Sequence, residues 1–115
     1  PVVGSGLWGP IWGFLSFEGG SANTIFGASF DHKSETPGLG AEIRESFFED
    51  AFIGKKILDD NDLFVSVTVV KGGADKGNNH QVDGITGGTI TSDGVTNMLK
   101  NDLEVYNNYF EKIRN

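Results

Sequence analysis

The last part of the chain carries the pattern that most limits how it can fold. Between residues 93 and 113, apolar side chains recur at steps of three and four, apart from one adjacent pair; they are Val95, Met98, Leu99, Leu103, Tyr106, Phe110 and Ile113. This period predicts an amphipathic helix whose apolar face must be covered by another layer of the protein. Thr91, Ser92 and Asp93 are favourable N-cap residues, so we expect the helix to start near residue 93.

The sequence before this helix predicts strands that can form the layer covering its apolar face. Residues 7–17, 24–30 and 63–70 are rich in aromatic and β-branched side chains, and the short turn between the first two predicts an antiparallel hairpin. A second, shorter helix is expected over residues 41–53, where Ile43, Phe47, Phe48, Ala51 and Phe52 lie at helical spacing. The order β-β-α-β-α predicts a single α+β domain over residues 1–115, with helices packed on an antiparallel sheet.

Composition excludes several kinds of function. The 115 residues carry a formal net charge of −7 without a basic cluster, which argues against nucleic acid as a partner. There is no cysteine and there are only two histidines, so thiolate sites and an all-histidine metal site are excluded. The chain begins at Pro1 rather than Met, and we expect any membrane anchor to lie upstream of it.

The glycines near the N-terminus match a dinucleotide-binding pattern. Gly4-Ser5-Gly6-Leu7-Trp8-Gly9 has the form G-x-G-x-x-G. That motif requires a strand before it and a helix starting at it, so that the helix N-terminus meets the pyrophosphate. Here a β-type segment follows, which favours a glycine-flanked strand start over a Rossmann site.

Two further glycine-containing loops are open to two interpretations. Thr36-Pro37-Gly38 predicts a turn after the second strand, and Lys71-Gly72-Gly73 follows the third strand. Each could be an ordinary connection, or a place where backbone approaches a planar or anionic ligand. His32 and Glu35 could form a metal pair, but the sequence offers no third ligand nearby, so a solvated histidine is favoured and no metal site is predicted.

The segment before the long helix is more informative. Asp83, Thr86, Gly87, Gly88 and Thr89 are followed by Thr91 and Ser92 at the expected helix start. A helix N-terminus presents unpaired amides and the positive end of the helix dipole, which suit a phosphate group. The same residues could instead serve only as caps, and composition leaves both interpretations open.

At this segment the sequence resembles a known family. Asp83-x-x-Thr86-Gly87-Gly88-Thr89 resembles the motif D-x-x-(S/T)-G-A-T of FMN-binding domains that a dedicated flavin transferase modifies, with Gly88 in place of Ala. Four other stretches resemble the C subunit of the sodium-translocating NADH:quinone oxidoreductase: Gly6-Leu7-Trp8-Gly9, Glu35-Thr36-Pro37-Gly38-Leu39-Gly40, Gly54-Lys55-Lys56 and Val70-Lys71-Gly72-Gly73-Ala74.

The resemblance implies a cofactor and the residues that hold it. FMN would be esterified through its phosphate to Thr89, and Asp83 would take part in recognition by the flavin transferase. The other implied flavin-site residues are Trp8, Glu35, Thr36, Gly38, Leu39, Lys71, Thr86, Gly87, Gly88 and Thr91. No residue is expected to be catalytic, because the flavin carries the redox chemistry itself.

The resemblance also implies a place for the protein in the cell. It would be an electron carrier in a membrane NADH:quinone reductase, with the other subunits as partners, at the bacterial inner membrane with this domain on the periplasmic side. The isolated domain would be inactive. One alternative is the homologous G subunit of the Rnf electron-transport complex, and another is a non-catalytic extracellular binding module without flavin.

Overall fold

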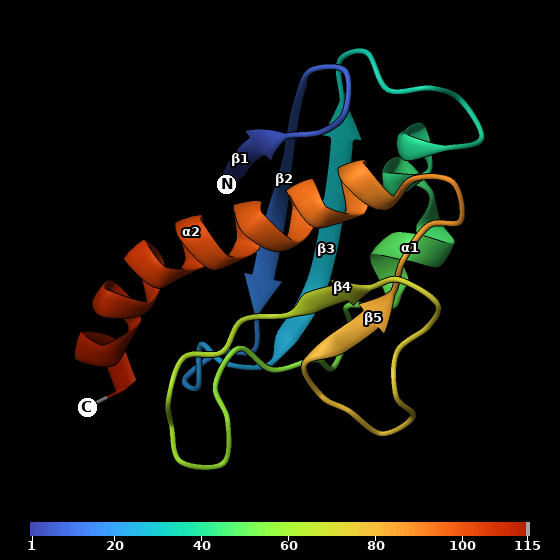
Figure 1. Ribbon diagram of the computed structural model, residues 1–115. Coiled ribbons are helices and arrows are strands. Elements are labelled where there is room, and N and C mark those ends of the chain that lie inside the picture. Colours follow the sequence, from blue (N-terminus) through green and yellow to red (C-terminus); the bar gives the residue numbers. More distant parts are fainter. Residues whose placement is uncertain (115) are drawn as a thin grey trace.

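A three-stranded antiparallel sheet forms the first layer of the protein. The computed structural model describes residues 1–114, and Figure 1 shows the arrangement of its elements. Strands β1 (Val2–Ser5), β2 (Pro10–Phe17) and β3 (Ile25–His32) lie in the order β1-β2-β3. The predicted hairpin is confirmed as β2 and β3, which pair antiparallel with a register shift at Ser16 and Phe17. Strand β1 was not predicted, because four residues carry too little alternation to be seen.

Helix α2 (Thr89–Arg114) crosses one face of this sheet (Figure 1). Its buried residues Val95, Met98, Leu99 and Leu103 join Val2, Ile11, Ile25 and Phe30 of the sheet in one hydrophobic core. Burial of this apolar stripe is the main force that holds the helix on the sheet. The predicted α+β class, with a helix packed on an antiparallel sheet, is confirmed.

The predicted start of the long helix was wrong by four residues. The Ser92 amide donates to the Gly88 carbonyl at 2.8 Å, so the first helical hydrogen bond closes there and Gly88 occupies the N-cap position. Thr91 and Ser92 therefore lie inside the first turn and do not cap the helix. The apolar period begins only at Val95. The turn before it is polar, so the sequence pattern gave no reason to predict an earlier helix start.

The predicted third strand is also largely wrong. Only β4 (Thr68–Val70) is a strand, and it pairs in parallel with β5 (Gln81–Asp83) in a separate two-stranded sheet. Residues 63–67 instead form a loop in which Ser66 has a positive φ of 60°. The amides of Val65 and Ser66 both donate to the Ile57 carbonyl, at 2.8 and 3.0 Å. This shared acceptor bends the chain away from a regular ladder.

The predicted helix over residues 41–53 is divided in two. A 3-10 helix, η1 (Gly40–Arg44), is followed by the short α1 (Ser46–Asp50), and Glu45 between them is extended, with φ −81° and ψ 147°. The break lets Phe48 and Phe52 pack on Phe30, with ring centroids 5.7 and 5.1 Å away. Aromatic packing against β3 thus overrides the helical spacing.

The dinucleotide pattern lies in a strand connection. Residues 6–9 form a turn closed by the Gly6 amide and the Gly9 carbonyl at 2.8 Å, and β2 starts at Pro10, later than the predicted strand start at residue 7. No helix opens at these glycines, which rules out a Rossmann site there. Within residues 1–114, no helix has the length and apolar character to cross a membrane.

Candidate functional site

A cavity of about 390 Å³ lies where three chain segments meet. The segments are the turn before β2, the loop from β3 to η1, and the first turn of α2. They contribute the lining residues Leu7, Trp8, Glu35, Thr36, Leu39, Gly40, Gly87, Gly88, Thr89, Ile90 and Thr91. We call this space the first cavity. The structure thus brings together Trp8, the predicted loop at residues 35–40 and the predicted motif at residues 86–89.

The walls of the first cavity are mostly apolar. Four large hydrophobic side chains on it are unusually accessible: Leu7 is 49%, Trp8 65%, Leu39 43% and Ile90 56% exposed. Exposed apolar side chains that converge on one concave surface are typical of a binding site for a planar organic group.

Glu35 lies at the polar end of the first cavity and is only 4% exposed. Its Oε1 accepts from the Leu7 amide at 2.9 Å, and its Oε2 accepts from the Trp8 amide at 2.8 Å. The Thr91 hydroxyl donates to Oε1 as well. The carboxylate therefore connects the turn before β2 with the first turn of α2.

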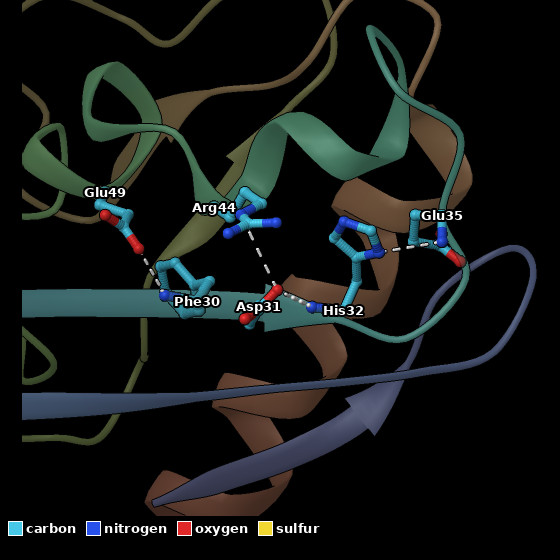
Figure 2. A network of polar contacts seen from close by, with 6 residues as sticks. All are labelled: Phe30, Asp31, His32, Glu35, Arg44 and Glu49. Atoms are coloured by element: carbon cyan, nitrogen blue, oxygen red, sulfur yellow. Dashed lines mark hydrogen bonds and ion pairs between the residues drawn. The ribbon is translucent and has the colours of Figure 1, made fainter.

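These contacts keep Glu35 ionised. Burial alone raises the pKa of a carboxyl group, but here the hydrogen bonds from the Thr91 hydroxyl and from the Trp8 and Leu7 amides outweigh it. The pKa of Glu35 therefore lies below its ordinary value of 4.5. His32 is half-buried rather than fully solvated, and its Nδ1 accepts from the Glu35 amide at 3.0 Å (Figure 2).

Two glycines make room for this carboxylate. A Cβ added to Gly6 would lie 3.2 Å from Glu35 Oε2 and closer still to Oε1. A Cβ added to Gly40 would lie 3.0 Å from Oε1 and would also collide with the Thr91 hydroxyl. Since a Cβ atom does not approach other atoms so closely in real proteins, both positions need glycine. The carboxylate of Glu35 is therefore tightly packed between them.

A second cavity, of about 490 Å³, also borders the loop before α2. It is lined by Lys71, Gly72, Gly73, Asp83, Gly84, Ile85, Thr86, Gly87 and Thr89. Gly87 and Thr89 border both cavities. Asp83 Oδ1 accepts from the Ala74 amide at 2.7 Å and so ties down the loop that follows Lys71. The predicted residues Lys71, Asp83 and Thr86 thus gather around this second space.

The first turn of α2 faces the boundary between the two cavities. The Ser92 amide makes the first helical bond, so the amides of Thr89, Ile90 and Thr91 have no acceptor within the helix. Together with the helix dipole, they make this position favourable for an anion. Lys71 lines the second cavity, which Thr89 also borders, and adds a positive charge there.

The four hydroxyl side chains of this region differ in availability. Thr91 is buried and serves Glu35, while the buried Ser92 Oγ accepts from the Ile85 amide at 3.2 Å. Thr86 is exposed and borders only the second cavity. Thr89 is half-buried at helix position N1 and borders both cavities.

Of the remaining predicted residues, Thr36 and Leu39 line the first cavity, whereas Gly38 does not. Gly38 has φ +80° and lies in the turn that directs the chain toward η1. Gly87 has φ +76°, and a Cβ there would lie 2.6 Å from Leu39 Cδ2. Sequence reasoning missed Ile90 as a wall residue, although an exposed apolar residue beside the threonine motif is a usable signal.

Metal binding has no support in the described structure. Across residues 1–114, no three His, Cys, Asp or Glu side chains come together in a group that could hold a metal ion. His32 and Glu35 do contact each other, but through the Glu35 backbone amide rather than its carboxylate.

Known proteins share this sequence and architecture. The sequence profile of the FMN-binding domain family matches residues 6–104. The chain is 44% identical over 95 residues to the C subunit of the Na(+)-translocating NADH-quinone reductase of Vibrio anguillarum, covering 83% of this chain and 36% of that protein. The corresponding C subunit of Pseudomonas aeruginosa is 42% identical over 103 residues, covering 86% of this chain and 38% of that protein.

Solved structures agree. The crystal structure of the Na(+)-translocating NADH-quinone reductase C subunit from Parabacteroides distasonis matches with a TM-score of 0.83 and 53% identity, covering 91% of this chain and 52% of that one. NqrC of Shewanella oneidensis matches with a TM-score of 0.77 and 34% identity, covering 86% of this chain and 45% of that one.

These matches confirm the resemblance inferred from the sequence motifs. The chain spans less than two fifths of the length of the two curated relatives named above. The family profile, in contrast, covers most of the chain and includes every segment that lines the first cavity. The chain therefore belongs to the FMN-binding domain family, and the relatives it resembles are C subunits of Na(+)-translocating NADH-quinone reductases.

Proposed function

We propose that this chain is the FMN-carrying, electron-transferring domain of a sodium-translocating NADH:quinone reductase, with the flavin phosphate esterified to Thr89. The observation that carries the proposal is the position of Thr89. Its side chain is half-buried at N1 of α2 and borders both an apolar cavity and a second cavity that carries Lys71. FMN combines an apolar ring with an anionic phosphate, and these two environments match its two ends.

The residues present fit such a cofactor. Leu7, Trp8, Leu39 and Ile90 offer apolar surface to a planar ring. The free amides of the first α2 turn and the positive end of its dipole favour a phosphate ester, which stays anionic after attachment. Gly87 leaves the Leu39 side chain in place beside the site, since a Cβ at this position would lie 2.6 Å from Leu39 Cδ2.

Several of the predicted residues would then hold the group. Thr36 and Leu39 border the ring side of the site, and Lys71 and Thr86 border the phosphate side. Glu35 and Thr91 stay bonded to each other beneath the first cavity. When bound, the flavin supplies the capacity to accept and release electrons, and the protein orients it and sets its surroundings.

Gly88 replaces the alanine of the motif without loss of a reacting group. A Cβ at this position would lie 3.0 Å from Ile85 Cγ2 and 3.4 Å from the Gly40 amide nitrogen. Ile85 fills the space that an alanine methyl would need, so glycine suits the packing of this particular chain.

The proposal includes partners and a location. The names of the relatives support other reductase subunits as partners, a place at the bacterial inner membrane and an oxidoreductase role for the complex. A flavin transferase would load the domain, with Asp83 in its recognition motif, and the domain would lie on the periplasmic side. The Rnf G subunit remains the alternative within the same class, and co-purified neighbouring subunits would separate the two. A flavin-free binding module is disfavoured by membership of the FMN-binding family.

The decisive experiment tests which threonine carries the flavin. The chain and its Thr89→Ala variant are co-expressed with the flavin transferase and run on a denaturing gel. Thr89→Ala should be folded but show no flavin fluorescence, because the accepting hydroxyl is gone. Thr89→Ser should retain some, since the hydroxyl remains.

Thr91→Ala serves as the control for this experiment. Its hydroxyl is buried against Glu35, so the variant should keep covalent flavin while losing stability. Peptide mapping that finds flavin on Thr91 or Thr86, or a Thr89→Ala protein that is still covalently yellow, would refute the assignment to Thr89.

A further inference from the structure

We infer that Glu35 is a positioning residue, whose carboxylate holds the Leu7–Trp8 turn against the first turn of α2 and thereby fixes the shape of the first cavity. The resemblance implied that Glu35 contacts the flavin. The hydrogen bonds indicate a different part for it, in which the carboxylate acts on the flavin site through the backbone of Leu7 and Trp8.

The bonding pattern carries this inference. Both carboxylate oxygens are engaged by the protein: Oε1 by the Leu7 amide and the Thr91 hydroxyl, and Oε2 by the Trp8 amide. The three donors come from two segments that are far apart in sequence and form separate walls of the cavity. Hydrogen bonds to an ionised acceptor are about twice as strong as neutral ones, so this contact is a firm link between the walls.

Packing around the carboxylate supports the same conclusion. Glu35 is only 4% exposed, and neither Gly6 nor Gly40 could accept a Cβ beside it. The exposed Trp8 and Leu7 side chains, by contrast, have little packing of their own to hold them. Their backbone amides donate to Glu35, so we expect the orientation of both side chains to depend on its carboxylate.

A chemically similar residue of α1, Glu49, provides a matched control. Glu49 Oε2 accepts from the Phe30 amide at 2.7 Å, and Figure 2 shows it well away from Glu35 along β3. Glu49 does not line the first cavity. Glu49→Gln makes the same charge change as Glu35→Gln, on a carboxylate that also accepts a hydrogen bond from a backbone amide.

The first test uses the chain without flavin and so does not depend on the proposed function. Amide hydrogen exchange at Leu7 and Trp8 is measured by NMR in the wild-type chain, Glu35→Gln and Glu49→Gln. A Gln at position 35 keeps one acceptor oxygen but turns an NH₂ group toward a backbone donor. Exchange at both amides should therefore accelerate about tenfold or more in Glu35→Gln, in line with the loss of a hydrogen bond to a charged group. It should be unchanged in Glu49→Gln.

The second test uses the flavin-loaded chain and rests on the proposed function. Glu35→Gln should still bind flavin covalently through Thr89, but the visible circular dichroism of the flavin and its reduction potential should shift. Glu49→Gln should leave both unchanged. If neither the wild-type chain nor any variant carries flavin, the proposed function is wrong. The exchange test still shows whether Glu35 positions the Leu7–Trp8 turn.

A second variant covers the case in which Glu35→Gln does not fold. Thr91→Val removes only the hydroxyl that joins Glu35 to α2 and keeps a similar volume. It should also speed exchange at Leu7 and Trp8, though less. The inference would be overturned if these amides exchanged in Glu35→Gln at the wild-type rate. If Glu35→Gln does not fold, a wild-type exchange rate in Thr91→Val would overturn it instead. Equal acceleration of exchange in Glu49→Gln would also overturn it.

Discussion

Single side chains explain why one threonine of this region is suited to carry a cofactor. Thr91 and Ser92 look equivalent to Thr89 in the sequence, but their hydroxyls are buried and bonded to Glu35 and Ile85. A hydroxyl that satisfies a buried partner cannot be modified without leaving that partner unpaired, which costs about 1–3 kcal/mol. Thr89 carries no such role in the packing and borders both cavities.

The lowered pKa of Glu35 predicts a specific dependence of stability on pH. Because the pKa is lower in the folded chain than its ordinary value of 4.5, ionised Glu35 stabilises the fold above that value. This contribution is lost as the pH falls through the folded pKa. The hydrogen bonds from the Thr91 hydroxyl and from the Trp8 and Leu7 amides favour the carboxylate.

The measurement is urea unfolding of the wild-type chain and Glu35→Gln from pH 7 down to pH 3. The difference in free energy of unfolding between them should be constant near neutral pH and should shrink below about pH 4.5. A difference that grows on acidification would contradict the assignment. Glu49→Gln, measured alongside, reports the effect of removing a carboxylate far from the cavity.

At the scale of elements, the close crossing of α2 over β1 positions the site. Gly94 lies in α2, and a Cβ there would lie 3.1 Å from the Ser5 carbonyl carbon and closer still to its oxygen. Gly4 in β1 faces Met98 of the helix in the same way. These glycines let the helix approach the strand closely. The distance between α2 and β1 in turn determines the position of the first turn of α2 relative to the Leu7–Trp8 turn.

Gly94→Ala should therefore destabilise the protein, although alanine is favoured over glycine in helices by about 1 kcal/mol. The new methyl group must push α2 away from a backbone carbonyl, and such overpacking costs about 1–3 kcal/mol. Asn97→Ala, at an exposed position of the same helix, should be neutral or stabilising. Thermal unfolding of both variants tests this, and a Gly94→Ala protein as stable as wild type would show that the helix can shift freely.

At the scale of the whole molecule, the proposed function is that of an electron carrier that holds a flavin. The one dinucleotide pattern lies in the turn between β1 and β2, without a helix behind it. Both cavities instead meet at Thr89 and Gly87. Under the proposed function, a flavin held at Thr89 would receive electrons from one partner and pass them to another.

The flavin-loaded chain by itself should thus show no NADH oxidation and no quinone reduction. Dithionite should nevertheless bleach its flavin, and air should restore the colour, because the cofactor carries the redox chemistry. The assay follows NADH absorbance with and without a quinone. Steady turnover by the isolated chain would contradict its assignment as a carrier.

Sequence by itself determined the parts of this protein that depend on local pattern. The β2–β3 hairpin and the apolar face of α2 are each contained in a short run of residues and were predicted from local pattern, whereas the threonine motif before α2 was identified by its resemblance to a known motif. The family resemblance rested on the same short motifs. Local preference and final structure agree there, because the burial of these segments matches their own period.

Tertiary structure decided what depends on contacts between distant residues. Glu35 and Thr91 are 56 positions apart, and only the packing of α2 on the sheet brings the hydroxyl to the carboxylate. The same packing divides the helix expected over residues 41–53, so that Phe48 and Phe52 can reach Phe30. It also turns most of the expected third strand into a loop around the Ile57 carbonyl. In each case the free energy of a long-range contact outweighs a weak local preference, and no local pattern records that contact.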